Sequence, residues 1–222
     1  MGNEPFDSKG FSGIVPLFPL PSVVLFPGMF LPLHIFEPRY REMTRDALQG
    51  EKLIAMALLK PGWEPSYAAA PAIHQVLGMG KIVESDALEG GRFNLVLFGL
   101  VRVRVVQEIG AGPYRTAQVE LLEERAPDSG SYERKRRTLI ALYAQVMKDL
   151  TKGAIPSPPD DVPLGMLCDL VASLLKFDMA VKQELLEELD AGARCDRLLE
   201  LLQAVGDPLP PRRAWPTGPS LN

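Results

Sequence analysis

Residues 14–38 read IVPLFPLPSVVLFPGMFLPLHIFEP, an apolar stretch that contains six prolines. Proline has no backbone N–H to donate to a neighbouring strand, so this stretch cannot form one long central strand of a sheet. Its apolar side chains nevertheless indicate that it is buried. The stretch therefore predicts short extended pieces that bend at the prolines, over residues 14–18, 23–26 and 30–36.

A helix is predicted directly after this stretch. Glu37-Pro38 places a proline in the first turn, where its missing N–H costs nothing, and Gly50 is suited to end the helix. Glu37 and Arg39 are close enough in sequence to form a local ion pair at the turn from strand to helix.

The chain from residue 53 to 122 has the pattern of short β-strands. Glycine-rich turns at 89–91 and 110–113 separate apolar runs, and near the second turn valines alternate with Arg102 and Arg104, which predicts a half-buried strand. The predicted strands cover residues 53–59, 73–83, 92–100, 101–105 and 114–122. Short strands at this spacing indicate a small closed or nearly closed β barrel.

Beyond Glu123 the apolar residues recur at helical spacing, which predicts an amphipathic helix around residues 139–150 and three further helices after residue 163. Asp178 and Asp190 are candidate N-caps for the last two helices. The prediction is an α+β chain, a β barrel followed by an α-helical bundle. Its expected parts are a flexible N-terminus (1–11), a barrel subdomain (12–125), a helical subdomain (126–206) and a proline-rich flexible tail (207–222).

Composition and charge exclude several classes of protein. The 222 residues are 46% hydrophobic and 23% charged, as in an ordinary globular chain, and 24 basic against 28 acidic residues give a net charge of −4. A mildly acidic chain is a poor electrostatic binder of DNA or RNA. We interpret the basic run at 133–137 as a solvated helix face. Two cysteines, no secretory leader and no long apolar run favour a cytoplasmic protein without a membrane segment.

Residues that could carry catalysis are few. His34 and His74 are interpreted as structural, and Cys168 and Cys195 as inert core residues on the apolar stripes of two helices. These four residues lack the spacing of a zinc site. Residues 78–81, GMGK, lack the remainder of a phosphate-binding loop and are interpreted as a bulge or close backbone approach. We therefore expect no catalytic residues, no cofactor and no metal.

Three blocks of sequence resemble the substrate-binding N-terminal domain of Lon protease. They are PLFPLPSVVLFPGMFLPLHIFEPRYREM (16–43), GMGKIVESDALEGGRFNLVLFGLVRVRVV (78–106) and LGMLCDLVASLLKFDMAVKQELLEELDAGARCDRLLELL (164–202). The resemblance implies a PUA-like β barrel followed by an α-helical bundle. In Lon this domain precedes an ATPase with a Walker A loop and a proteolytic Ser–Lys pair. Neither motif occurs in this sequence, so the expectation is polypeptide binding without ATP hydrolysis or peptide cleavage.

The candidate polypeptide-binding residues are aromatic and apolar. Trp63 and Tyr67 lie in the proline-rich loop PGWEPSY, where an aromatic side chain can anchor a partner, although Trp63 could instead fold back and close one end of the barrel. Met29 and Phe30, after Pro27-Gly28, are second candidates.

Two functions remain open from the sequence. The first is a non-catalytic module that binds unfolded or damaged polypeptides as an adaptor, regulator or chaperone-like protein, with a protease or chaperone as a candidate partner. The alternative is a PUA-like module that binds RNA or a nucleotide, against which the acidic composition weighs. The sequence does not specify the client or the oligomeric state.

Overall fold

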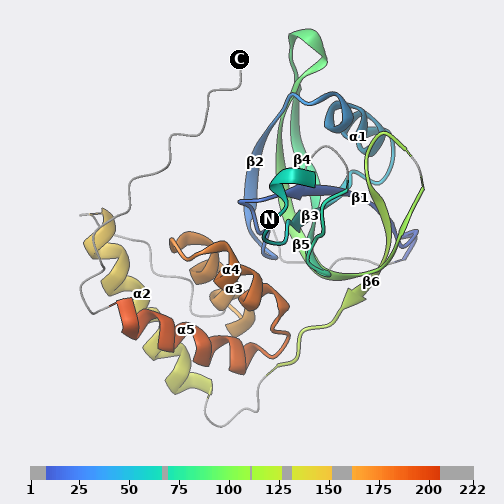
Figure 1. Ribbon diagram of the computed structural model, residues 1–222. Coiled ribbons are helices and arrows are strands. Elements are labelled where there is room, and N and C mark those ends of the chain that lie inside the picture. Colours follow the sequence, from blue (N-terminus) through green and yellow to red (C-terminus); the bar gives the residue numbers. More distant parts are fainter. Residues whose placement is uncertain (1–8, 67–69, 111, 127–131, 152–161, 206–222) are drawn as a thin grey trace.

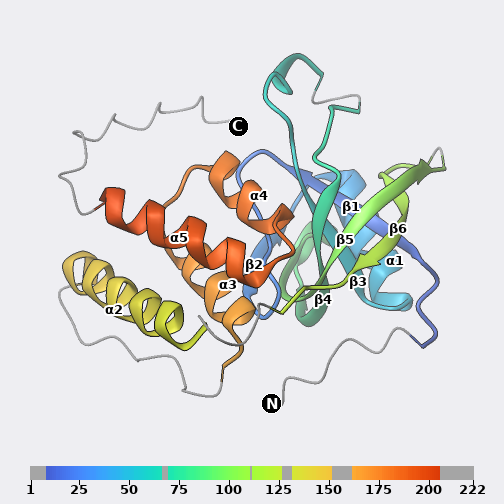
Figure 2. The ribbon, with the colours of Figure 1, turned by 90° about the horizontal axis from the view of Figure 1, so that it is seen from below.

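The computed structural model describes residues 9–66, 70–110, 112–126, 132–151 and 162–205. Its strands are β1 (Ile14–Leu20), β2 (Phe30–Ile35), β3 (Leu53–Leu58), β4 (Val76–Ala87), β5 (Phe93–Ile109) and β6 (Thr116–Leu122). Its α-helices are α1 (Pro38–Gln49), α2 (Tyr132–Thr151), α3 (Leu164–Leu174), α4 (Met179–Glu187) and α5 (Ala191–Val205). Figures 1 and 2 show the strands and α1 on one side and the other helices beside them, which confirms the predicted α+β architecture.

The strands form a nearly closed barrel with one strand added outside the ring. The sheet order is β2-β5-β4-β3-β1-β6, and an additional pairing of β5 with β6 closes the ring. β1 and β3 run parallel, whereas the other pairs are antiparallel. Among the described strands, β2 pairs with β5 alone. Pro32 in the middle of β2 fits this edge position, because its nitrogen can face away from the ladder.

The predicted turn from strand to helix is present. α1 begins at Pro38 and ends before Gly50, and the Arg39 Nη2 lies 2.9 Å from the Glu37 Oε2. Tyr40 and Met43 of α1 are buried against apolar side chains of the barrel. The helix therefore covers part of the barrel core, as the spacing of its apolar residues requires.

The predicted extended piece at 23–26 is not a strand. It crosses the sheet, where the Leu25 carbonyl lies over Gly78 and the Phe26 carbonyl over Gly99. A Cβ atom at Gly78 would lie 1.8 Å from the Leu25 oxygen, and one at Gly99 would lie 2.1 Å from the Phe26 oxygen. These glycines permit the crossing, which confirms the close backbone approach expected at residues 78–81; the register of β4 also shifts after Met79.

β5 is one continuous strand of 17 residues, and Arg102 in its middle is buried. This corrects the half-buried pattern expected there, in which both arginines would face water. Arg104 is exposed, but the helical bundle covers Arg102, whose Nε donates to the Leu186 carbonyl at 2.8 Å. Its Nη1 and Nη2 donate to the Asp169 carboxylate of α3 at 3.0 and 2.6 Å.

The ion pairs around Asp169 join the barrel to the bundle. Arg194 of α5 is fully buried, with its Nε 3.5 Å from the Asp169 Oδ1, and it also pairs with Glu124. Arg102 and Arg194 thus balance the charges of Asp169 and Glu124. Burial raises the pKa of the Asp169 carboxyl, and the two guanidinium groups oppose that rise.

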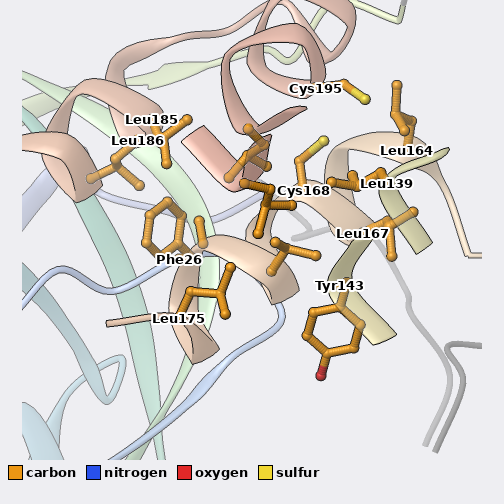
Figure 3. Close-up of a cluster of buried hydrophobic side chains, with 14 of the residues drawn as sticks. Phe26, Leu139, Tyr143, Leu164, Leu167, Cys168, Leu175, Leu185, Leu186 and Cys195 are labelled. Atoms are coloured by element: carbon orange, nitrogen blue, oxygen red, sulfur yellow. The ribbon is translucent and has the colours of Figure 1, made fainter. Parts of the chain in front are cut away.

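The bundle core consists of apolar residues from α2 to α5, together with Phe26 from the segment that crosses the sheet (Figure 3) and Val76 at the start of β4. Asp190 caps α5, since its Oδ1 accepts hydrogen bonds from the Gly192 and Ala193 amides at 2.8 and 2.9 Å. Asp178 precedes α4 but makes no side-chain cap hydrogen bond. In the described residues beyond β6, α2 to α5 correspond to the four helices that the sequence predicts, whereas the domain boundaries at 126 and 206 remain predictions.

The basic run at 133–137 is only partly solvated, which corrects its interpretation as a solvated face. Arg136 is buried, and its guanidinium donates to the Val162 carbonyl. The Lys135 Nζ lies 2.6 Å from the Asp196 carboxylate of α5. Helix α2 packs against α5 along this side, so two of its cations are used within the bundle.

Candidate functional site

The loop that follows β3 contains the candidate residues Trp63 and Tyr67. Trp63 is partly buried and packs against the apolar cluster inside the barrel, as in the alternative in which it closes one end. Tyr67 lies outside the described residues. Trp63 therefore presents only part of its side chain to a partner.

Met29 and Phe30 lie side by side in sequence but in different surroundings. Met29 is partly buried against the apolar core of the helical bundle. Phe30, the first residue of β2, is 68% exposed, and its ring contacts that of Phe98 on β5 with centroids 4.9 Å apart. Of the four candidates, Phe30 is the one whose side chain is both described and largely open to a partner.

Phe30 belongs to a face of the sheet that we call the open sheet face. Residues directly opposite one another on neighbouring strands point to the same face. The register of β2, β5 and β4 therefore places three rows of side chains on the open sheet face: Phe30, Phe98 and Lys81; Pro32, Val96 and Glu84; His34, Asn94 and Asp86. These rows lie on the β4–β5 hairpin and the added strand β2, in the upper part of the barrel in Figure 1.

The edge of this face along β2 is apolar and aromatic. Phe36 follows β2 and is 61% exposed, and its ring stacks on that of His34 with centroids 6.1 Å apart. His34 is exposed, and its Nδ1–H donates to the Asn94 Oδ1 at 2.7 Å. His34 lies on the surface although it belongs to the apolar stretch, because alternate side chains of an edge strand face outward.

A hollow of about 430 Å³ lies at the far end of the open sheet face. Its walls include Pro32, His34, Glu84, Asp86, Asn94 and Val96. Neither Glu84 nor Asp86 forms an ion pair with any residue that the structure describes. The hollow thus combines apolar walls with two carboxylates that are available to a partner.

Two other hollows are lined by charged groups that already have partners. One, of about 420 Å³, lies beside Arg115, whose Nη2 is 2.5 Å from the Glu108 carboxylate. The other, of about 530 Å³, lies between the barrel and the bundle, where the His74 Nδ1 is 3.1 Å from the Glu187 Oε1. His74 lies just before β4, not in the strand predicted for it. Neither hollow presents aromatic side chains as exposed as Phe30.

The thiols do not provide a nucleophile. Cys168 and Cys195 are fully buried, and the interaction with Cys195, together with burial, raises the pKa of the Cys168 thiol. A thiol held in its neutral form is a poor nucleophile. The interaction with Cys168 lowers the pKa of the Cys195 thiol instead, but Cys195 lies in the core of the bundle, where no substrate reaches its sulfur. In the described ranges, no three His, Cys, Asp or Glu side chains are grouped to hold a metal ion, and no helix is long and apolar enough to cross a membrane.

Sequence reasoning identified Phe30 but missed its neighbours. Phe98, Glu84 and Asp86 join the face only through the antiparallel pairing of β5 with β2 and β4. A bulge between Ile82 and Glu84 shifts the register of β4, so the carboxylate that joins this face cannot be identified by counting along the strand. The alternation of side chains along each strand of the hairpin can be derived from the sequence, but it shows only which residues of one strand share a face.

Comparison with known proteins identifies relatives over almost all of the chain. The family model for the ATP-dependent protease La (LON) substrate-binding domain matches residues 14–204. The Lon protease of Dictyoglomus thermophilum is 30% identical over 194 residues, which cover 83% of this chain and 24% of that protease. The Lon protease of Xanthomonas oryzae is 30% identical over 204 residues, or 87% of this chain and 23% of that protease. The chain thus spans about a quarter of the length of these relatives.

Two solved structures share the fold. The Lon N-terminal domain protein from Xanthomonas campestris has a TM-score of 0.62 and 26% identity, and the match covers 84% of this chain and 97% of that chain. The N-terminal domain of Mycobacterium avium complex Lon protease also has a TM-score of 0.62, with 18% identity over 88% of this chain and 100% of that one. At that lower identity the likeness concerns the fold alone.

Proposed function

The chain belongs to the ATP-dependent protease La (LON) substrate-binding domain family, and on this basis we propose that it is a non-catalytic module that binds polypeptides. Its clients are unfolded or damaged chains, and it acts as an adaptor, a regulator or a chaperone-like protein. A separate protease or chaperone would receive the bound client.

We place the binding site on the open sheet face. The observation that carries this choice is the exposure of Phe30, which is 68% open to solvent while it contacts the Phe98 ring. Burying an aromatic side chain in an interface is among the largest single contributions to binding. Unfolded polypeptides expose apolar side chains that a folded protein buries, and an aromatic surface selects for them.

Binding of a fluorescently labelled, reduced and unfolded protein, followed by anisotropy, tests this proposal. Phe30→Ala is expected to weaken binding about thirtyfold, because truncation of an aromatic anchor costs about 2 kcal/mol. Leu174→Ala is the control, since Leu174 is 48% exposed on α3, outside the open sheet face. Equal affinities of the two variants would contradict the choice of surface.

The same assay separates the two functions that the sequence left open. Contact through apolar side chains predicts an affinity for the unfolded protein that changes little with salt, because such contacts are not screened. Binding to RNA would instead fall steeply as salt rises. Tight, salt-sensitive RNA binding that is unaffected by Phe30→Ala would favour the alternative.

A further inference from the structure

We infer that the open sheet face selects apolar segments that carry a lysine or arginine a few residues from their aromatic or aliphatic anchor. This inference rests on the proposed function and adds a charge preference to it. Apolar and acidic side chains are unevenly distributed over the three rows of this face.

The rows place the aromatic and acidic ends of the face at a fixed separation. Phe30 and Phe98 form the first row, and Asp86 lies in the third, beside His34. Successive rows are two residues apart along β2, or about 6.6 Å, so the first and third rows are about 13 Å apart. An extended segment that lies along β2 with an apolar side chain on Phe30 therefore reaches the carboxylates two to four residues further on.

Positive and negative side chains lie toward opposite ends of the open sheet face. Lys81 is in the row of Phe30 and Phe98, whereas Glu84 and Asp86 are in the second and third rows. Both carboxylates line the hollow of about 430 Å³, and neither is in an ion pair within the described part of the chain. A basic side chain is thus disfavoured beside the aromatic pair and favoured at the hollow.

The hollow has the chemistry to accept the long side chain of lysine or arginine. Pro32 and Val96 supply an apolar wall for the methylene groups, and Glu84 and Asp86 supply acceptors for the charged end. The ion pairs would be partly exposed, so each contributes a modest factor, at most about fivefold in affinity. Affinity thus depends mainly on the aromatic pair, and the carboxylates set the preference among apolar segments.

Two labelled peptides test the inference. Both have a Gly-Ser backbone and the same pair of phenylalanines; one carries lysine a few residues beyond the pair, and the other carries glutamate at that position. We expect the lysine peptide to bind the wild-type protein about fivefold more tightly at low salt. Raising salt from about 50 to about 500 mM should remove most of that difference, because it shortens the screening length.

Variants of the protein test whether the preference for the lysine peptide arises from the open sheet face. In Glu84→Gln/Asp86→Asn the two peptides should bind equally. Glu120→Gln/Glu200→Gln removes two exposed carboxylates elsewhere, on β6 and α5, and should keep the preference, which excludes an effect of net charge alone. The inference is overturned if the wild-type protein shows no preference, or if the preference survives in Glu84→Gln/Asp86→Asn.

Phe30→Ala separates failure of this inference from failure of the proposed function. If Phe30→Ala weakens both peptides alike but the wild-type protein does not distinguish them, only the charge preference is refuted. If Phe30→Ala leaves both affinities unchanged, the open sheet face is not the binding site and both proposals fail.

Discussion

Asp169→Asn is the substitution that most directly tests how the barrel and the bundle are held together. Asp169 is almost fully buried and accepts two hydrogen bonds from Arg102, at 2.6 and 3.0 Å, with the Arg194 Nε 3.5 Å from its Oδ1. Asparagine has nearly the same shape but no charge. The substitution would leave two buried guanidinium groups facing the single carboxylate of Glu124. The side-chain N–H groups of the asparagine would also face the N–H groups of Arg102, so that neither has an acceptor.

The expected cost of Asp169→Asn follows from this geometry. Removing one partner of a buried ion pair typically costs about 3–5 kcal/mol, because the remaining charge stays buried without compensation. For a chain of this size each kcal/mol lowers Tm by about 2–4 °C, so we expect Tm to fall by about 6–20 °C. Thermal unfolding followed by circular dichroism, together with urea unfolding, measures the change.

Glu120→Gln is the matched control for Asp169→Asn. It breaks the pair between the Arg104 Nη1 and the Glu120 Oε1, which are 2.7 Å apart with both side chains about half exposed. Arg104 lies on the same strand as Arg102, but an exposed pair contributes only about 0–1 kcal/mol. If Asp169→Asn costs no more than Glu120→Gln, the buried ion pairs do not stabilise the joint between barrel and bundle. If Arg102→Met/Asp169→Leu is more stable than Asp169→Asn, the cost of Asp169→Asn arises from the guanidinium charge of Arg102, which stays buried without its carboxylate.

Two further predictions concern local geometry. Gly78→Ala should prevent or strongly destabilise folding, because its Cβ would lie 1.8 Å from the Leu25 carbonyl oxygen. Gly112→Ala is the control and should cost much less, because its Cβ would lie 3.7 Å from the Tyr114 carbonyl oxygen and its backbone is outside the left-handed region. Equal soluble yield and Tm for the two variants would contradict the backbone crossing. Asp190→Ala should cost about 1 kcal/mol at neutral pH by removing the α5 cap. The hydrogen bonds from the Ala193 and Gly192 amides lower the pKa of Asp190, so its contribution is present above the ordinary aspartate pKa and is lost as pH falls through the lowered value. Urea unfolding as a function of pH should therefore show the penalty of Asp190→Ala shrinking in acid, while Asp190→Asn, which keeps an acceptor, shows a smaller penalty at neutral pH.

The candidate site shows how far sequence reasoning extends. Phe30 was identifiable because it follows Pro27-Gly28 in an apolar stretch. Its partner Phe98 and the carboxylate of Asp86 lie more than fifty residues away in sequence, and only strand register brings them beside β2. Trp63 had an equally favourable loop composition, but whether a loop folds back onto the barrel depends on the space that the barrel end leaves.

Proline placement, turn glycines and apolar periodicity act over a few residues, so the sequence predicts the type and order of most elements; the exceptions are residues 23–26, which are not a strand, and β5, which is one strand where two were predicted. Pro32 restricts β2 to an edge, and Pro38 begins α1. Which faces are covered depends on tertiary contacts. Arg102 is buried because Asp169, 67 residues away, compensates its charge, and Phe26 lies in the bundle core because Gly78 and Gly99 let its segment cross the sheet. A periodic pattern predicts which side chains share a face of a helix or strand. Whether that face contacts water or another element depends on residues that are distant in sequence.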